Sequence, residues 1–204
     1  MKSLGVILDK CLTFDSQVKA TCKAIHYYAR SLRHIRRPLR DTLAKSVASF
    51  IVAGLDYCNS LLVGISDANI QRLQIAQNTV AHVVSRTSKY EHIRPVLCSL
   101  HWLPVEYLIT FKIAITTFSI RQFGEPVYLA SILHDKVPVS SLTSSYKSLL
   151  DVPRRRTETA KRSFSFVATT IWNSLPVHFR QLDPITVSKS KKQLKTHFFH
   201  IANP

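Results

Sequence analysis

Two interleaved stripes of side chains between residues 15 and 37 constrain the fold more than any other feature of the sequence. The first stripe is apolar and has the 4-3-4-3 spacing of one helix face: Val18, Cys22, Ile25, Ala29 and Leu32. The second stripe is basic and is offset from the first by one residue: Lys19, Lys23, His26, Arg30, Arg33 and Arg37. Because one residue turns a helix by about 100°, the basic stripe lies beside the apolar one. The spacing predicts a helix from about Asp15 to Arg37, stopped by Pro38.

Helical periodicity continues through the middle of the chain. A second helix is expected to begin after an N-cap at Asp41 and to be covered nearly all round, with an inward side of Leu43, Val47, Phe50, Gly54 and Cys58. A third is expected to open at Ser66, with an inward side of Ile70, Leu73, Ala76 or Gln77, Val80 and Val84. A short helix over 93–100 and a longer one over 104–122, closed by Gly124, follow.

Prolines interrupt the rest of the chain, which predicts loops with short helices, an extended segment over 149–157 and a final basic helix over 185–199. The chain has only four glycines, few for a β-rich or nucleotide-cradling fold. The predicted fold class is therefore mainly α, a helical bundle followed by a loop-rich basic extension with short helices.

Positive charge gathers at the two ends of the chain, whose net charge is +16. Residues 1–63 carry 10 basic and 4 acidic side chains, 64–135 carry 6 and 5, and 136–204 carry 12 and 3. Such a field favours phosphate backbones or anionic membranes. No run approaches the roughly 20 apolar residues of a membrane span, so we expect an intracellular protein without a membrane partner.

Two further basic clusters lie near aromatic residues, a combination that suits tracking of a nucleic-acid backbone. The members of the two clusters are Arg154, Arg155 and Arg156, and Lys189, Lys191, Lys192 and Lys195. For the basic stripe the alternative is a solvated face, and for these two clusters it is a role in solubility or a targeting-like patch.

Candidate catalytic and metal-binding groups are few. Cys98 and His101 could face each other as in a cysteine hydrolase, but no orienting partner or oxyanion pocket is marked. The four cysteines have no disulfide or zinc spacing. We therefore expect a packed corner at Cys98–His101, held by Leu100, Trp102 and Leu103. The sequence predicts no catalytic residue, metal ligand or cofactor.

Several motifs, in order and spacing, are similar to the carboxy-terminal region of LINE-type (non-LTR) retrotransposon reverse transcriptases, which are RNA-directed DNA polymerases. They cover nearly the whole chain: LGVILDKCLTF, LDYCNSLLVGIS, LQIAQNTVAHVV, LHWLPVEYLITFK, VPRRRTET, FSFVATTIWNSLP and QLKTHFF. The resemblance implies that residues 1–12 end the palm at the primer grip, 13–135 form a thumb-like bundle, and 136–204 form a basic extension.

The resemblance also implies a function. The family's catalytic aspartate pair, which holds Mg²⁺ in the palm, lies upstream of residue 1, so we expect no synthesis by this chain alone. We expect it to bind an RNA or DNA template–primer by its phosphates, with the palm as a further partner, in the cytoplasm or nucleus.

The chain departs from the family's pattern at several positions. Ala160 and Lys161 stand where the family commonly has Gly-Asp, Tyr107 and Leu108 where it often has Arg-Ile, and Ser190 where it often has an aromatic residue. These changes suggest a diverged copy. The alternative is therefore an inactive remnant, or a helical protein-interaction domain.

Overall fold

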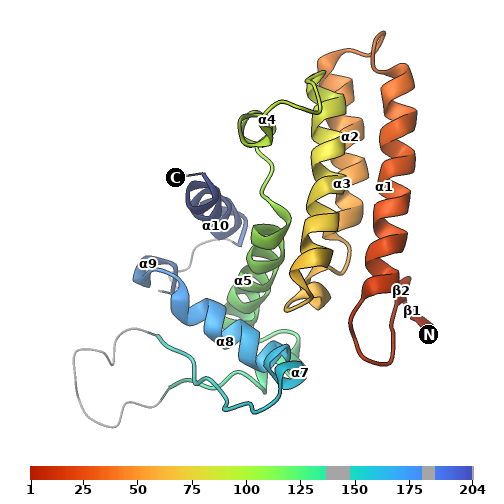
Figure 1. Cartoon of the computed structure of the whole chain (residues 1–204). Helices are drawn as coiled ribbons and strands as arrows, with labels where there is room; N and C mark the ends of the chain where they lie inside the picture. The colour runs from red at the N-terminus through yellow and green to blue at the C-terminus, as the bar shows by residue number, and fades with distance from the viewer. Residues whose placement is uncertain (137–147, 181–186, 204) are drawn as a thin grey trace. The chain divides into compact units, whose positions relative to one another are not determined.

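The computed structural model describes residues 1–136, 148–180 and 187–203, with the backbone alone at 187 and 188 (Figure 1). The chain divides into two compact units. Unit 1 comprises Met1–Ile109 with Phe199–Pro204, and unit 2 comprises Thr110–Phe198. Helices dominate both units, which confirms the mainly α fold class. The predicted segments 1–12, 13–135 and 136–204 were assigned from the functional parts of a polymerase family, whereas the two units are defined by contacts within the structure. The segment boundaries therefore stay predictions.

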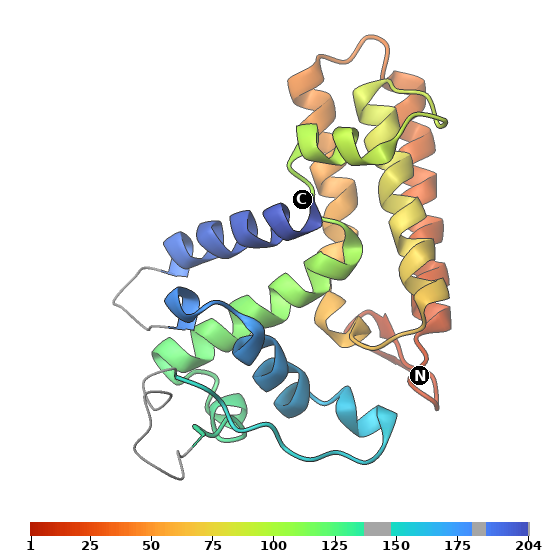
Figure 2. The ribbon, with the colours of Figure 1, turned by 60° about the vertical axis from the view of Figure 1, so that its left-hand side comes forward.

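Three helices pack pairwise in unit 1: α1 (Asp15–Ile35), α2 (Asp41–Asp56) and α3 (Asp67–Ser85), as Figures 1 and 2 show. A single 3₁₀ turn, η1 (Asn59–Leu62), lies between α2 and α3. The apolar stripe of α1 is the face that packs, because Val18, Ile25, Ala29 and Leu32 are buried and Cys22 is half-buried. The predicted register of α1 is therefore confirmed, although the helix ends at Ile35 and Arg37 lies in the following turn.

The predicted inward side of α2 was wrong. Leu43, Val47 and Phe50 are exposed, and Phe50 has 83% of its surface accessible. The buried side lies one residue further along: Ala44, Ala48, Ile51, Val52 and Leu55. Ala44 and Ala48 are fully buried, so two small residues let the helix backbone approach its neighbours closely. Asp41 is also not the N-cap, because Arg40 holds that position and Asp41 belongs to the first turn.

The predicted inward residues of α3 are buried, except for the half-buried Ile70. The two following helices, α4 (Ile93–Leu100) and α5 (Val105–Phe123), match the expected 93–100 and 104–122 to within a residue. Gly124 follows α5 with a φ of +70°, where a left-handed conformation favours glycine. Sequence spacing thus located these helices correctly.

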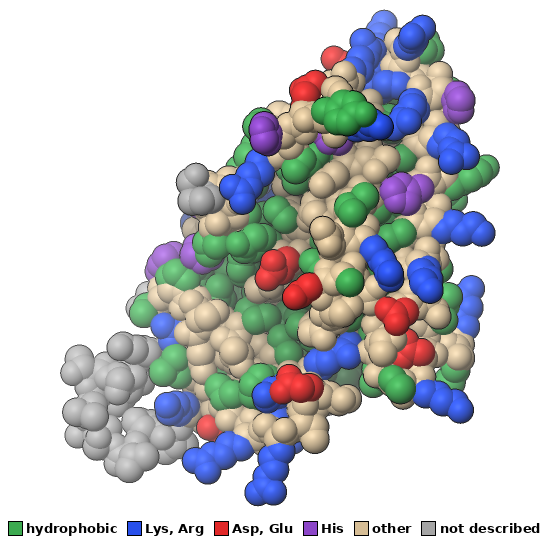
Figure 3. Space-filling view, viewed as in Figure 1, with side chains coloured by type: hydrophobic (Ala, Val, Ile, Leu, Met, Phe, Trp, Pro, Cys, Tyr) green, Lys and Arg blue, Asp and Glu red, His purple; other side chains and the backbone are tan. Residues whose placement is uncertain are grey.

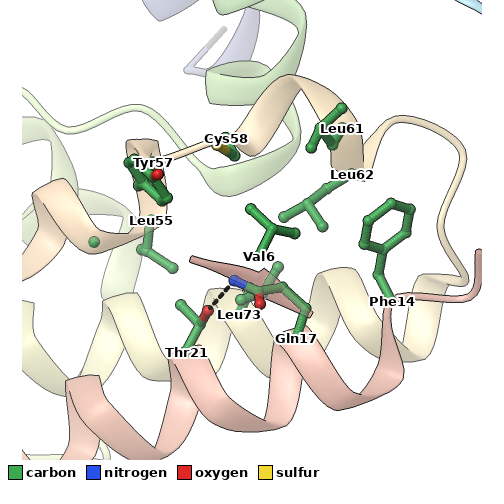
Figure 4. Close-up of a pocket in the computed structure, with 11 residues that line it drawn as sticks. Val6, Phe14, Gln17, Thr21, Leu55, Tyr57, Cys58, Leu61, Leu62 and Leu73 are labelled. Atoms are coloured by element: carbon green, nitrogen blue, oxygen red, sulfur yellow. Dashed lines mark hydrogen bonds between the residues drawn. The ribbon is translucent and has the colours of Figure 1, made fainter. Parts of the chain in front are cut away.

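A two-stranded hairpin opens the chain, with β1 (Lys2–Ser3) antiparallel to β2 (Val6–Ile7). Its Val6 side chain enters a space of about 10 Å³ beside Phe14, Leu62 and Leu73 (Figure 4). That volume holds at most one water molecule. Val6 therefore packs against the helices of unit 1 and this space has no room for a larger ligand, whereas Leu4 of the same motif is exposed.

Unit 2 contains α5 from Thr110 onward and several shorter helices. These are α6 (Val127–Ala130), α7 (Glu158–Lys161), α8 (Phe164–Ser174), α9 (Val177–Arg180) and α10, which runs over Val187–Ala202. Trp172 is fully buried, and its indole nitrogen donates a hydrogen bond to the Ser148 carbonyl at 2.8 Å. Asn173 accepts from the Leu150 amide and donates to the Leu150 carbonyl, which pins the loop before Arg154 onto α8. The expected loops with short helices are therefore present.

One stretch, Ile93–Phe123, is long and apolar enough to cross a membrane by length and composition alone, a test that core helices also pass. It consists of α4, a break at 101–104, and α5. Each unit buries side chains of α5, Val105 and Ile109 in unit 1 and Ile113 and Phe118 in unit 2. Packing inside the protein therefore accounts for much of this apolar character.

Candidate nucleic-acid interface

The basic stripe of α1 is exposed along the whole helix. Its predicted members form no ion pair with any described residue: Lys19, Lys23, Arg30, Arg33 and Arg37. From Lys19 to Arg33 the stripe extends over 14 residues, or about 21 Å. Figure 3 shows Lys and Arg side chains following α1 and gathering near the ends of α1 and α3. We call these five side chains the α1 basic face.

An apolar groove lies on the other side of the buried seam of α1. It has a volume of about 690 Å³, and residues of α1 such as Thr21, Ala24, Tyr28 and Ile35 line it together with Phe50 of α2. On a helix with about 100° per residue, these α1 positions lie roughly 100° to one side of the seam and the basic face roughly 100° to the other. α1 therefore presents two chemically different surfaces, one cationic and one apolar.

Arg36 ties the ends of the three helices together. It is 5% exposed, and its guanidinium donates to the Val84 carbonyl at 2.7 and 2.9 Å and to the Leu39 carbonyl at 2.9 Å. It also forms an ion pair with Asp41 at 2.6 Å. The hydrogen bond from Arg36 and the attraction of its charge, against a weaker effect of desolvation, hold the pKa of Asp41 below its ordinary value.

Arg36 was not among the predicted site residues, although the sequence contains its signal. The 4-3-4-3 spacing of the apolar stripe places the next inward position at residue 36, four residues after Leu32. A basic residue at an inward position predicts a buried, paired guanidinium. The same spacing that predicts the core of α1 therefore identifies Arg36 as a structural residue.

A concave, basic site lies where α1 and α3 end, and we call it the basic hollow. It has a volume of about 450 Å³, and most of its lining residues are cationic or polar: Arg33, Arg36, Arg37, His82, Val83, Arg86, Thr87 and Lys89. None of the described residues that line it is acidic. Arg86 donates to the carbonyls of Arg36 and Arg37 at 3.3 Å. Arg86 and Lys89 were missed by sequence analysis because they lie in a polar link without periodicity.

The basic clusters expected near the end of the chain are also exposed, and they belong to unit 2. Arg154, Arg155 and Arg156 lie in a segment without helix or strand, where Arg155 contacts the Ser165 hydroxyl at 3.2 Å. The four lysines at 189, 191, 192 and 195 lie on α10, away from its buried Ser190, Leu194 and Phe198. The predicted site residues are thus divided between the two units, and in unit 2 they lie on two separate segments.

The Cys98–His101 corner is a helix end. α4 stops at Leu100, and His101 has a left-handed φ of 55°. The amide of His101 donates to the Cys98 carbonyl and that of Trp102 to the Leu97 carbonyl, both at 3.0 Å, the hydrogen bonds of a Schellman cap. Leu97, Leu100 and Trp102 pack in one apolar cluster with Ala81. The expected packing of Leu100 and Trp102 is present, although Cys98 is only half-buried and His101 is exposed. The described residues contain no group of three or more His, Cys, Asp or Glu that could hold a metal.

Two of the motifs quoted above contact each other inside unit 1. Gln77, which is fully buried, donates to the Leu103 carbonyl at 2.8 Å. Gln74 accepts from the Val105 amide at 2.8 Å and donates to Gln77. The glutamines of LQIAQN thus bind the backbone of LHWLPV, which makes both motifs structural.

No protein-family model, no curated protein and no solved structure matches the chain. The likeness to reverse transcriptases therefore rests on the sequence motifs.

Proposed function

We propose that this chain is a nucleic-acid-binding part of a LINE-type retrotransposon reverse transcriptase, which holds a template–primer duplex by its phosphates. The sequence motifs support the family assignment, and the α1 basic face is the proposed binding surface. The observation that carries the proposal is the continuous exposure of five Lys and Arg side chains on one side of α1 without an acidic partner among the described residues. The Mg²⁺ of such a polymerase belongs to its palm, and no residue of this chain is assigned to it.

The geometry of the face suits a duplex backbone. A double helix carries about one negative charge per 1.7 Å, so a face of about 21 Å meets several phosphates. Lysine and arginine side chains on a convex helix reach phosphates without entering a groove, and phosphate contacts fix position without reading bases. Binding is therefore expected to be independent of sequence and strongly dependent on salt.

The test is a salt titration of duplex binding by the full chain, measured as fluorescence anisotropy of a labelled RNA–DNA hybrid. Lys23→Gln with Arg30→Gln should flatten the slope of log K against log salt by about 1–2 units, because each lost phosphate contact removes about 0.9. Lys45→Gln with Arg94→Gln is the matched control, since it removes two exposed charges from α2 and α4. An equal flattening of the slope in both double variants would mean that the overall positive charge attracts the duplex diffusely, and would contradict the proposal.

The apolar groove supports a second candidate function, a protein-binding face. Tyr28, Ile35 and Phe50 line the groove and are 50–83% exposed, more apolar surface than a helix needs for its own packing. The partner that the sequence resemblance suggests is the palm of the same polymerase. Tyr28→Ser with Phe50→Ser should leave duplex binding unchanged and should weaken binding of the palm. Loss of duplex binding in this variant, with the fold intact, would mean that the groove contacts the duplex and would contradict the protein-binding role. A chain that binds no duplex in any form would fit the inactive remnant.

A further inference from the structure

We propose that the basic hollow is a discrete phosphate-binding site, which shares Arg33 and Arg37 with the α1 basic face but gathers its charges around one position. The inference rests on the proposed function and adds to it one defined position at which a backbone phosphate is held. The ligand class is a phosphate group carrying at least one negative charge, within a nucleic-acid backbone or at its end. The arrangement of the helix ends at the hollow carries the inference.

The carboxy-terminal ends of two helices lie at the hollow, and their carbonyls would repel an anion. The carboxy-terminal ends of α1 and α3 each carry about half a negative charge on their last carbonyls. In the hollow, the Arg36 guanidinium binds the Val84 and Leu39 carbonyls, and Arg86 binds those of Arg36 and Arg37. Two arginines therefore bind the Val84 carbonyl near the end of α3 and three carbonyls of the turn after α1, which offsets part of the negative potential that would repel an anion.

The other three cationic side chains of the hollow favour the binding of an anion. Arg33, Arg37 and Lys89 line it, are exposed and form no ion pair with any described residue. Asp41 neutralises one of the five cations, and the two helix ends count for about one negative charge. A surplus of about three positive charges therefore surrounds a space without an acidic side chain.

Concavity separates this site from the rest of the basic face. Lys19, Lys23 and Arg30 lie in a row on one convex helix, so each meets a different phosphate. In the hollow, side chains from α1, from the turn after it and from the link after α3 converge on about 450 Å³. Several charged donors around one anion give charge-assisted hydrogen bonds to the same group. The hollow is therefore expected to saturate with a small anion, and the row is not.

The experiment titrates inorganic pyrophosphate into the full, ¹⁵N-labelled chain at physiological salt and follows backbone and arginine side-chain NMR signals. We expect the signals of Arg33, Arg37, Arg86 and Lys89 to shift together along one single-site curve. Arg37→Gln with Lys89→Gln should weaken that binding by at least about tenfold, because two charge-assisted contacts are lost. Lys19→Gln with Lys23→Gln is the matched control and removes the same amount of charge. These two lysines lie about 18 Å or more from Arg37, which exceeds the screening length of about 8 Å. The control should therefore change the pyrophosphate affinity less than twofold.

The two double variants separate this inference from the proposed function. Pyrophosphate shifts spread over all basic residues, or an equal loss in both variants, would overturn the hollow as a discrete site even if duplex binding persists. Absence of duplex binding together with single-site pyrophosphate binding would overturn the proposed function and leave the anion site standing. An ordered fold in each variant is checked by the dispersion of the amide signals, and Arg37→Lys serves as a second variant that keeps the charge and should retain most of the affinity.

Discussion

Arg36 shows how one side chain can determine the position of several elements. Its guanidinium donates to the Val84 carbonyl near the end of α3, to the Leu39 carbonyl in the turn after α1 and to the carboxylate of Asp41 at the start of α2. Arg36→Met keeps an apolar stem but removes both hydrogen bonds to the Val84 carbonyl and the ion pair with Asp41, so the free energy of unfolding should fall by about 2–3 kcal/mol. Arg40→Gln, an exposed neighbour, should change it by less than about 0.5 kcal/mol. Urea unfolding followed by circular dichroism measures both, and equal effects would refute the structural role of Arg36.

The pair also predicts how stability depends on pH. The folded state lowers the pKa of Asp41 below its unfolded value of about 3.9, so the unfolded state binds the proton more readily. The stabilisation by Asp41 is therefore fully present above the unfolded pKa and is lost as the pH falls through the folded pKa. The melting temperature of the native chain should exceed that of Asp41→Asn at pH 6, and the difference should shrink below about pH 4. A difference that grows on acidification would contradict the sign. The pKa of Asp9 is also lowered, but Asp9 is present in both proteins and its effect cancels.

At the scale of whole helices, spacing predicted α1 and α3 correctly and failed for α2. In α1 the apolar and basic residues are cleanly separated, so only one face can be inward. α2 carries large apolar residues on two sides, and its true inward face is marked by small residues, Ala44 and Ala48. Periodicity cannot rank two apolar faces, because the choice depends on how closely neighbouring helices approach. The exposed face that remains then forms one wall of the apolar groove.

The corrected face of α2 makes a direct prediction. Phe50→Ser should change the free energy of unfolding by less than about 0.5 kcal/mol, because the ring is 83% exposed. Leu55→Ala, on the buried side, should cost about 2–4 kcal/mol through lost burial and a cavity. Thermal unfolding of the two variants against the native chain measures the contrast. The reverse order of costs would restore the face that sequence spacing suggested.

The candidate site was predictable only where side chains follow a helix. The α1 basic face could be listed from sequence because its members, together with His26, recur every three or four residues. The basic hollow could not, because Arg86 and Lys89 come from a link that reaches α1 only after the chain has folded. The sequence hints at the hollow only through Arg36, whose inward position predicts a buried, paired guanidinium. That position does not predict which carbonyls Arg36 binds. Contacts between segments about 50 residues apart depend on tertiary packing, which no local pattern contains.

At the scale of the whole molecule, the two compact units each carry a basic surface, and this predicts how binding depends on duplex length. A duplex of about 10 base pairs, about 34 Å long, is enough to cover the α1 basic face of about 21 Å, whereas one of about 30 base pairs has length left for a second contact, for which Arg154–Arg156 are the candidates. Simultaneous engagement turns the second contact into an intramolecular one and raises the affinity without a new interaction. The ratio of long-duplex to short-duplex affinity should therefore fall by at least about tenfold in Arg154→Gln, Arg155→Gln, Arg156→Gln, while the short-duplex affinity stays nearly constant. The extra binding registers of a long duplex are the same for both proteins, so they cancel in this comparison.

Anisotropy at one fixed salt concentration supplies all four affinities. An unchanged ratio would mean that unit 1 alone holds the duplex, and an equal loss for both lengths would mean that the three arginines contact the same phosphates as α1.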